Sequence, residues 1–411
     1  MSLLDKATII TTPTAHGNGV LHSIKGGAVA DFDVVRGSAA TRVNAEGLIE
    51  DAAANIPRID YTDGTASVLL EPQSANLLEY SEDFISGNWA VDDVTILSDL
   101  SISPSGESNS SIVAANTIAS RHNIKRAKAG VNTAALSIFA KAKELSYIQI
   151  ASANSPQQFA NFDLSNGTVG SVGSGFSNAK IEDYGNGWYR CSVVSDNQYS
   201  QAIFSLVTSP TSSWLETWTS SNNTDGLYIW GAQLEELPYA TSYIPTNGAI
   251  ATRLADSVTG AGSADLINST EGVLYFEGKR LSLLGSKRTI SISDGSLNNY
   301  LYIQFPGVSN TVRIFYKTVE NGQVLLLNHP LTSPIEFGKY AFKWSDANFS
   351  LWVNGAKELE QLSGGTTSSN VFNQVDFSLS NGADEFIGKV KSVITFDTAL
   401  TDEELTCLTT I

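Results

Sequence analysis

The chain has 411 residues, 42% of them hydrophobic, so it is too long for one hydrophobic core and is expected to form two or three domains. Its 42 Asp and Glu against 25 Lys and Arg give a formal net charge of −17, which disfavours nucleic acid and anionic membranes as partners. Only 16% of the residues are charged, and Gly, Ser, Thr and Asn are abundant, a composition that favours an all-β fold.

No apolar run reaches the length of a signal peptide core or of a membrane span. We therefore expect a soluble protein without membrane insertion that is not exported by a conventional N-terminal signal. The two cysteines, Cys191 and Cys407, fall in different predicted domains, so a stabilising disulfide is not expected.

Residues 1–75 contain only two aromatic side chains, Phe32 and Tyr61. Because aromatic side chains supply much of the buried area of a core, this segment is not expected to build a core alone. We interpret it as an extended arm or small subdomain that packs on the neighbouring domain or on another subunit. This interpretation predicts a role in attachment and oligomerisation.

Short strands between turn signals are predicted throughout residues 76–256, as in a two-layer sheet. The clearest element is a hairpin in residues 180–194, because Gly185-Asn186-Gly187 supplies the positive φ values of a tight turn. The other predicted strands are Leu136–Ala140, Tyr147–Ala151, Phe159–Leu164, Ala202–Val207 and Leu227–Leu234.

Residues 257–411 repeat this pattern, with strands at the spacing typical of a sandwich. The predicted strands are Gly272–Phe276, Thr289–Ser293, Tyr300–Phe305, Val312–Thr318, Gln323–Leu327, Tyr340–Trp344, Phe349–Val353, Val375–Leu379 and Phe386–Phe396. A short C-terminal helix follows, because Thr401 and Glu404 have the spacing of a capping box.

Three sets of residues resemble known protein families. The first set resembles the N-terminal region of bacteriophage virion proteins of the fibre and tail type, and comprises 40–50 (ATRVNAEGLIE), 55–61 (NIPRIDY) and 69–77 (LLEPQSANL). The second is similar to the last strand and exit segment of the jelly-roll module of those proteins, and comprises 227–236 (LYIWGAQLEE) and 240–246 (ATSYIPT). The fold of that module is similar to that of carbohydrate-binding modules.

The third set is similar to the closing strands of concanavalin A-like (laminin-G type) lectin sandwiches, and comprises 349–355 (FSLWVNG) and 386–405. Together with the strand pattern, the resemblances predict an all-β chain: an extended N-terminal arm followed by two antiparallel β-sandwich (jelly-roll) domains. The expected domains are the arm in 1–75, a carbohydrate-binding-module-like jelly roll in 76–256, and a concanavalin A-like sandwich with a short C-terminal helix in 257–411.

Catalytic motifs are missing from the sequence. There is no zinc-protease, nucleophile-elbow or phosphate-loop signature, and the four histidines are scattered. Gln233 and Glu235 come closest to the alternating acids of a sandwich glycosidase, but a glutamine is no general acid. We therefore expect a protein that is not an enzyme.

Sugar binding is a more specific hypothesis than catalysis for the two β domains. Pyranose rings stack on aromatic side chains, and side-chain amides form hydrogen bonds with the sugar hydroxyls. The polar segment 211–223 carries the candidate glycan-binding residues Trp214, Trp218, Asn222 and Asn223. The alternative is that both tryptophans plug the edge of the sandwich. Four other tryptophans lie in predicted strands and are expected in the core, namely Trp188, Trp230, Trp344 and Trp352.

No cofactor is expected except a Ca²⁺ ion in the C-terminal sandwich, for which Asp294, Asp346 and Asp384-Glu385 are candidate loop ligands. Solvated turn acids are the favoured alternative. The basic run 121–128 (RHNIKRAK) would dock an acidic subunit or an anionic glycan, although a solvated face is the favoured interpretation.

The resemblance and the composition together predict a structural protein of a tailed-phage virion, with a fibre, tail or capsid-decorating role. Such a protein would form a homotrimer, contact other virion proteins through residues 1–75, and bind a host or environmental glycan; it would assemble into the virion in the host cytoplasm. The alternative is a secreted or surface bacterial lectin, or the non-catalytic part of a polysaccharide-degrading system.

Overall fold

The computed structural model describes residues 2–17, 19–98, 101–195, 199–333, 335–346 and 348–411. They form two compact units, and each is built from separated segments of the chain. Unit 1 comprises Met1–Ala39, Ala52–Pro72 and Ala255–Ile411, and unit 2 comprises Ala40–Asp51 and Gln73–Leu254. No helix among the described residues is long and apolar enough to cross a membrane.

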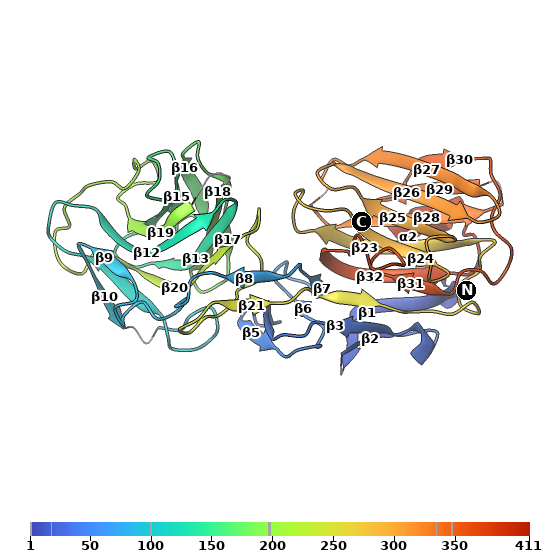
Figure 1. The fold of residues 1–411 in the computed structure, drawn as a ribbon, viewed down its shortest axis with the longest axis horizontal. Helices are drawn as coiled ribbons and strands as arrows, with labels where there is room; N and C mark the ends of the chain where they lie inside the picture. Colours follow the sequence, from blue (N-terminus) through green and yellow to red (C-terminus); the bar gives the residue numbers. More distant parts are fainter. Residues whose placement is uncertain (1, 18, 99–100, 196–198, 334, 347) are drawn as a thin grey trace. The chain divides into compact units, whose positions relative to one another are not determined.

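Unit 1 is a sandwich of two antiparallel sheets (Figure 1). The larger sheet has the order β22-β3-β2-β1-β32-β23-β28-β29-β30, and β7 pairs with β32 and β6. Its strands are β1 (Ala7–Gly17), β2 (Val20–Ser23), β3 (Phe32–Val35), β6 (Ile59–Asp60), β7 (Ser67–Leu70), β22 (Ser257–Thr259), β23 (Gly272–Arg280), β28 (Gly338–Ser345), β29 (Asn348–Val353), β30 (Ala356–Gln361) and β32 (Gly388–Phe396). The facing sheet has the order β27-β26-β25-β24-β31, with β24 (Arg288–Ser293), β25 (Tyr300–Phe305), β26 (Thr311–Thr318), β27 (Gly322–Pro330) and β31 (Gln374–Asp376).

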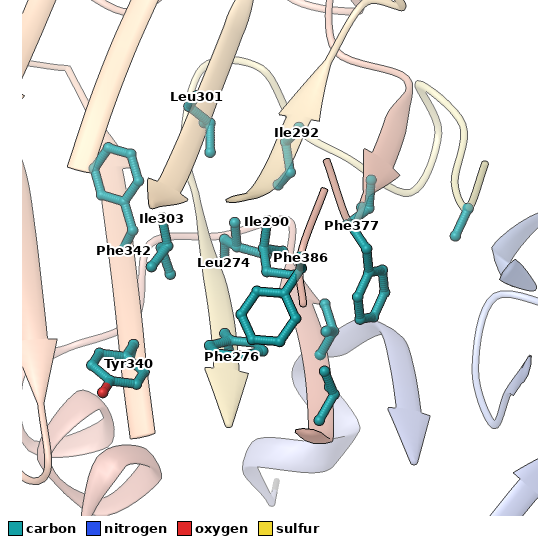
Figure 2. Packing of buried hydrophobic residues seen from close by; sticks show 14 of the residues in the cluster. Leu274, Phe276, Ile290, Ile292, Leu301, Ile303, Tyr340, Phe342, Phe377 and Phe386 are labelled. Carbon is teal, nitrogen blue, oxygen red and sulfur yellow. The ribbon is translucent and has the colours of Figure 1, made fainter. Parts of the chain in front are cut away.

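The core of unit 1 lies between these two sheets, where alternate residues of each strand point inward. Figure 2 shows Leu274 and Phe276 of β23 packed with Ile290 and Ile292 of β24 and with Phe386. The outer face of the larger sheet is covered by the C-terminal helix α2 (Asp402–Thr409), as the contacts of Leu405 show. The predicted capping box of this helix is confirmed. A second helix, α1 (Leu3–Lys6), and a 3-10 turn, η1 (Ala28–Ala30), lie near the N-terminus.

The segment predicted as an arm, residues 1–75, is divided between the two units. In unit 1, β1 and β7 pair with the two halves of β32, so this segment widens the C-terminal sheet. Its apolar side chains Ile9, Phe32 and Val68 are buried in the same core as the C-terminal strands. The segment finds apolar surface within its own chain, and the predicted boundaries differ from those of the units.

A buried ion-pair network fixes the N-terminal strands within unit 1. Arg58 donates to Glu71 Oε2 at 2.5 Å and to Asp256. The other carboxylate oxygen of Asp256 accepts from Arg36 Nη1 at 3.0 Å. Burial lowers the pKa of Arg58, but the charges of Glu71 and Asp256 raise it by more. The net effect is a pKa above the ordinary value of an arginine. All four side chains are almost completely buried, so each charge depends on its partners.

Unit 2 is a second sandwich, made of two six-stranded antiparallel sheets with the orders β10-β11-β20-β13-β18-β17 and β16-β15-β14-β19-β12-β9. The strands are β9 (Ala90–Asp92), β10 (Val94–Ser98), β11 (Ser111–Ala115), β12 (His122–Val131), β13 (Ala134–Ala142), β14 (Tyr147–Ala151), β15 (Phe159–Asp163), β16 (Thr168–Val172), β17 (Ser177–Asp183), β18 (Trp188–Ser195), β19 (Tyr199–Leu206) and β20 (Gly226–Glu235). Two small pairs add β4 (Ala40–Val43) with β5 (Ile49–Ala52), and β8 (Ser74–Asn76) with β21 (Ala251–Arg253).

The predicted all-β class with two antiparallel sandwiches is confirmed. The β17–β18 hairpin forms where it was predicted, and Gly185, Asn186 and Gly187 have φ values of 77°, 53° and 79°. Trp188, Trp230, Trp344 and Trp352 are buried as predicted. Cys191 is buried and Cys407 is exposed, and both are free thiols in the structure.

Candidate functional site

The candidate site lies on the outer face of the first sheet of unit 2, where β4 and β5 form a cover over an aromatic cluster. The cluster and the residues of the cover that bury it are Val43, Ile49, Phe139, Trp188, Trp230 and Tyr243, with Tyr184 and Tyr228 at its margin. The rings of Trp230 and Tyr243 lie 4.6 Å apart between centroids. The cover therefore turns an aromatic sheet face into a second, smaller core.

Three hydrogen bonds to backbone carbonyls hold the cover in place. Thr41 Oγ1 of β4 donates to the carbonyl of Tyr243 at 2.5 Å. The amide of Ile49 in β5 donates to the carbonyl of Pro104 at 2.8 Å. The loop that contains Pro104 is fixed in turn by Trp188, whose Nε1 donates to the carbonyl of Ile102 at 2.9 Å.

A cavity of about 320 Å³ opens at the margin of this cover. Its lining comes from five separate stretches of unit 2, and consists of Thr41, Ile49, Glu50, Asp51, Glu82, Ser105, Glu107, Trp230, Tyr243 and Pro245. A second hollow of about 470 Å³ shares Glu82 and Pro245 with it, so the two adjoin. These sizes are at the lower end of the range of small-molecule sites, about 300–1,000 Å³.

The described residues that line the first cavity are strongly acidic, with no lysine or arginine among them. Glu50 accepts from Arg42 at 2.8 Å. Among the described residues, none of Asp51, Glu82 and Glu107 has an ion-pair partner within 4 Å. The cavity therefore concentrates uncompensated negative charge.

Glu82 is the half-buried carboxylate of this group. The hydroxyl of Tyr243 donates to Glu82 Oε1 at 2.9 Å, and Asn109 Nδ2 donates to Oε2 at 3.1 Å. Burial raises the pKa of Glu82, and the charge of Asp51 raises it further, against the lowering effect of Tyr243 and of Trp230. Burial also raises the pKa of the Tyr243 hydroxyl, so this residue stays a neutral donor.

Trp230 differs from the six other tryptophans, all of which lie in described parts of the chain. Each of the six donates its indole N–H to an oxygen of the protein, and they are Trp89, Trp188, Trp214, Trp218, Trp344 and Trp352. Trp230 is 1% exposed. Its N–H is near enough to Glu82 to lower the pKa of that carboxyl, yet no acceptor among the described residues is in hydrogen-bonding geometry. An unsatisfied buried donor costs free energy, so this one favours a ligand that supplies an acceptor.

The structure places the predicted glycan-binding tryptophans on a loop that folds over the second sheet of unit 2. Both are half-buried, with Trp214 Nε1 donating to the carbonyl of Ser152 at 3.1 Å and Trp218 Nε1 to that of Leu206 at 3.2 Å. The Arg121 guanidinium lies 5.0 Å above the Trp214 ring, and His122 packs edge-on against Trp218. Each indole thus has structural partners within the unit.

Asn222 and Asn223 are exposed beyond this loop. The side-chain oxygen of Asn222 accepts from the amides of Thr224 and Asp225 at 2.8 and 3.0 Å, which is the geometry of an Asx turn. The four predicted residues therefore belong to one loop, and their role in glycan binding stays a prediction.

Gln233 and Glu235 are fully buried and serve the fold. Gln233 Nε2 donates to Glu235 Oε2 at 2.8 Å, and Ser74 Oγ donates to Glu235 Oε1 at 2.7 Å. The amide of Ile244 donates to Gln233 Oε1 at 2.6 Å. This network attaches the exit segment 240–246 to β20 and so positions Tyr243 at the cavity.

The predicted calcium ligands do not come together as a metal site in the described residues. Asp294 Oδ1 accepts from the amide of Ser296 at 2.9 Å, and the side chain of Asn299 donates to Oδ2 at 2.7 Å. These contacts belong to a loop that Asp294 stabilises. Asp384 lies 3.9 Å from Lys287 and 3.4 Å from Gln304 Nε2.

The basic run 121–128 is largely engaged within unit 2. Lys125 pairs with Asp92 at 2.5 Å, and Arg126 pairs with Glu79 at 2.8 Å. Two of its cations are thus neutralised by carboxylates of the same unit.

The cavity is not predictable from the sequence pattern. Its carboxylates Asp51, Glu82 and Glu107 are separated along the chain, and no spacing rule connects them. A signal existed in the resemblances, because the stretches 40–50 and 240–246 contribute Thr41, Ile49, Glu50 and Tyr243, as well as Pro245, to the lining. The resemblance of these two stretches to virion proteins does not by itself predict a binding site between them.

No family model and no curated protein matches the chain. Solved structures with partial similarity include the CBM40 domain of the Ruminococcus gnavus IT-sialidase, also determined with sialyllactose bound, at 15% identity and a TM-score of 0.31. That alignment covers 37% of this chain and 93% of the domain. Domain 4 of the arabinanase AbnA from Geobacillus stearothermophilus, in complex with arabinotriose, aligns at 12% identity and a TM-score of 0.31, over 41% of this chain and 81% of that domain.

A pentraxin from Limulus polyphemus aligns at 13% identity and a TM-score of 0.28, over 34% of this chain and 70% of its own. Likenesses at this level leave the ligand of the chain to be argued from its own residues.

Proposed function

We propose that the chain is a non-catalytic carbohydrate-binding protein and that the cavity beside Glu82 and Trp230 is its binding site. The observation that carries this proposal is the combination of donors and acceptors in one hollow. The Trp230 N–H lies near Glu82 without an acceptor in hydrogen-bonding geometry among the described residues, and within the same part of the chain the carboxylates of Asp51, Glu82 and Glu107 have no cation within 4 Å. A polyhydroxylated ligand supplies both kinds of partner from one ring, because each hydroxyl donates and accepts.

The walls of the cavity support the same proposal. Pro245 is exposed and provides apolar surface beside the almost fully buried rings of Trp230 and Tyr243, whereas Ser105 adds a hydroxyl. Ligand sites of this size combine apolar walls with a few fixed polar groups. Tyr243 and Glu82 are held by their mutual hydrogen bond, so the site is preorganised.

A glycan array tests this proposal on the full chain. Trp230→Phe removes the indole N–H and keeps most of the ring, and we expect it to weaken binding about fivefold, since a neutral hydrogen bond contributes about 1 kcal/mol. The double variant Trp214→Ala, Trp218→Ala addresses the loop predicted from the sequence and should leave binding intact. Absence of binding by the unmodified protein to every glycan would refute the proposal.

We also propose that the protein binds its ligand without hydrolysing it. After prolonged incubation, mass spectrometry should recover the bound oligosaccharide intact. Shortened products that disappear in Glu82→Gln would instead assign catalysis to this cavity.

The site supports the interpretation as a lectin, or as a non-catalytic part of a polysaccharide-degrading system, more directly than a virion role. The tailed-phage assignment, the homotrimer and the attachment through residues 1–75 rest on the sequence resemblance and stay predictions. Mass spectrometry of purified particles tests the first of these, and light scattering tests the second. The full chain should be used, because a truncated chain that begins at Leu77 would lack five strands of unit 1's larger sheet.

A further inference from the structure

We propose that the ligand of the Glu82–Trp230 cavity is an amino sugar with a free, protonated amine, such as a glucosamine oligomer. This inference rests on the proposed carbohydrate function and narrows it to one chemical class. The first observation is the negative charge of the carboxylates that line the cavity. A sugar without an amine would not neutralise this charge.

The carboxylates at this site differ from paired acids of unit 2 such as Glu79 and Asp92, which each have a basic side chain within 3 Å. Around the cavity, Asp51 and Glu107 are exposed at the margin and Glu82 is half-buried, and no lysine or arginine is among the described residues of the lining. The charge of Asp51 acts on Glu82, so an ammonium group placed between these two carboxylates of the lining is attracted by both.

The remaining contacts favour a sugar over a simple amine. The Trp230 N–H has no acceptor in hydrogen-bonding geometry among the described residues, and a ring hydroxyl oxygen provides one, whereas an alkylammonium group does not. Pro245, which is exposed in the lining beside Trp230 and Tyr243, supplies apolar wall for the C–H face of a pyranose. An aminohexose therefore satisfies the acidic and the aromatic side of the cavity with one residue.

Acidic and N-acetylated sugars are the ligands that this site should discriminate against. A uronate or a sialic acid would bring a further negative charge to a protein whose net charge is already −17. An acetylated amine is neutral and bulkier. The adjoining hollow beside Asp83 and Asn247 gives a second sugar residue room to extend.

Isothermal titration calorimetry on the full chain tests this inference with four probes: the hexamer of glucosamine, the hexamer of N-acetylglucosamine, cellohexaose and spermidine. We expect the glucosamine hexamer to bind about tenfold or more tightly than the two neutral hexamers, as a charge-assisted hydrogen bond is about twice as strong as a neutral one. Raising the ionic strength from about 0.01 M to about 1 M should remove most of this preference, because the Debye length falls from about 30 Å to about 3 Å.

Variants locate the effect. Glu82→Gln should weaken binding of the glucosamine hexamer about tenfold and leave cellohexaose within about threefold. Asp51→Asn, at an exposed position where folding is not at risk, should act in the same direction. Glu46→Gln is the matched control, since Glu46 is an exposed acid in the turn of the same β4–β5 hairpin and lies outside the lining.

The outcomes separate this inference from the function on which it rests. Equal binding of the three hexamers, lost in Trp230→Phe, would overturn the amino-sugar assignment and keep the carbohydrate site. Binding of spermidine as tight as that of the glucosamine hexamer, with no binding of the neutral hexamers, would overturn both. An effect of Glu46→Gln equal to that of Glu82→Gln would show non-specific attraction and would also overturn the inference.

Discussion

The two units use segments of the same N-terminal stretch in opposite ways. In unit 1, residues 1–39 and 52–72 add strands to a sheet, and the charges that they bury are neutralised by partners such as Asp256. In unit 2, residues 40–51 cover an aromatic face and bring two acids to its margin; Glu50 pairs with Arg42, and Asp51 has no cation within 4 Å among the described residues. Buried charges in a structural contact need partners of opposite charge, whereas we interpret the unbalanced charge beside the cavity as part of the proposed ligand site.

The largest expected effect on stability comes from disrupting the balanced ion-pair network of unit 1. Asp256→Ala leaves Arg36 and Arg58 without their shared carboxylate and should destabilise unit 1 by about 3–5 kcal/mol. Hydrogen exchange resolved by peptide should show faster exchange in unit 1 and unchanged exchange in unit 2. The control is Asp265→Ala, at an exposed acid of unit 1, and equal effects of the two variants would contradict the structural role of the network.

The second largest expected effect on stability comes from weakening the packing of the β4–β5 cover in unit 2. Ile49→Ala removes buried contacts between β5 and the aromatic cluster and should cost about 2–5 kcal/mol, whereas Ile49→Val should cost about 0.5–1.5 kcal/mol. Loss of ligand affinity in parallel with this series, measured by calorimetry, would show that the cover builds the site. Full affinity in Ile49→Ala would separate the cavity from the cover.

A smaller effect is expected at the C-terminal helix of unit 1. Thr401 Oγ1 accepts from the amide of Glu404, and Thr401→Ala should therefore destabilise the helix by about 0.5–2 kcal/mol. Exchange should rise in residues 402–409 alone, with Thr406→Ala, at an exposed position within the helix, as the control. A change in unit 2 would contradict the independence of the two cores.

The smallest effect concerns the unbalanced charge itself. The folded state raises the pKa of Glu82 above its ordinary value of 4.5, so the native state binds the proton more tightly than the unfolded chain does. Stability contributed by this group is present at low pH and is lost as the pH rises through the folded pKa. Glu82→Gln should consequently raise the melting temperature at pH 7 relative to the unmodified protein and lose this advantage near pH 4. A lower melting temperature for the variant at pH 7 would contradict the assignment of Glu82 as an uncompensated charge.

Local patterns in the sequence predicted most of the strands, because alternation and turn residues such as Gly185-Asn186-Gly187 act over a few residues. The capping box at Thr401 is local in the same sense. The place of residues 1–75 was not predictable in this way, since β1 and β7 pair with β32 more than 300 residues later. Low aromatic content indicated that the segment depends on other surfaces, but it could not identify them.

The candidate site was also not predictable from the sequence, because residues far apart in the chain form it. The sequence predicts Trp230 in the core, and its burial is confirmed, but no sequence pattern shows that its N–H has no acceptor in hydrogen-bonding geometry among the described residues. Glu82 follows β8 with no motif around it and gains its environment from Tyr243, more than 150 residues away in the chain. Only the folded chain brings these groups together.

The indole N–H resonances of the seven tryptophans test the central claim most directly. With ¹⁵N-labelled tryptophan in the full chain and Trp→Phe variants for assignment, titration with the glucosamine hexamer should shift the Trp230 resonance most strongly, because its N–H gains an acceptor. Trp214 and Trp218, already bonded to backbone carbonyls, should stay unchanged. Shifts confined to Trp214 and Trp218, with Trp230 unaffected, would contradict the account and place the ligand on the loop of the second sheet.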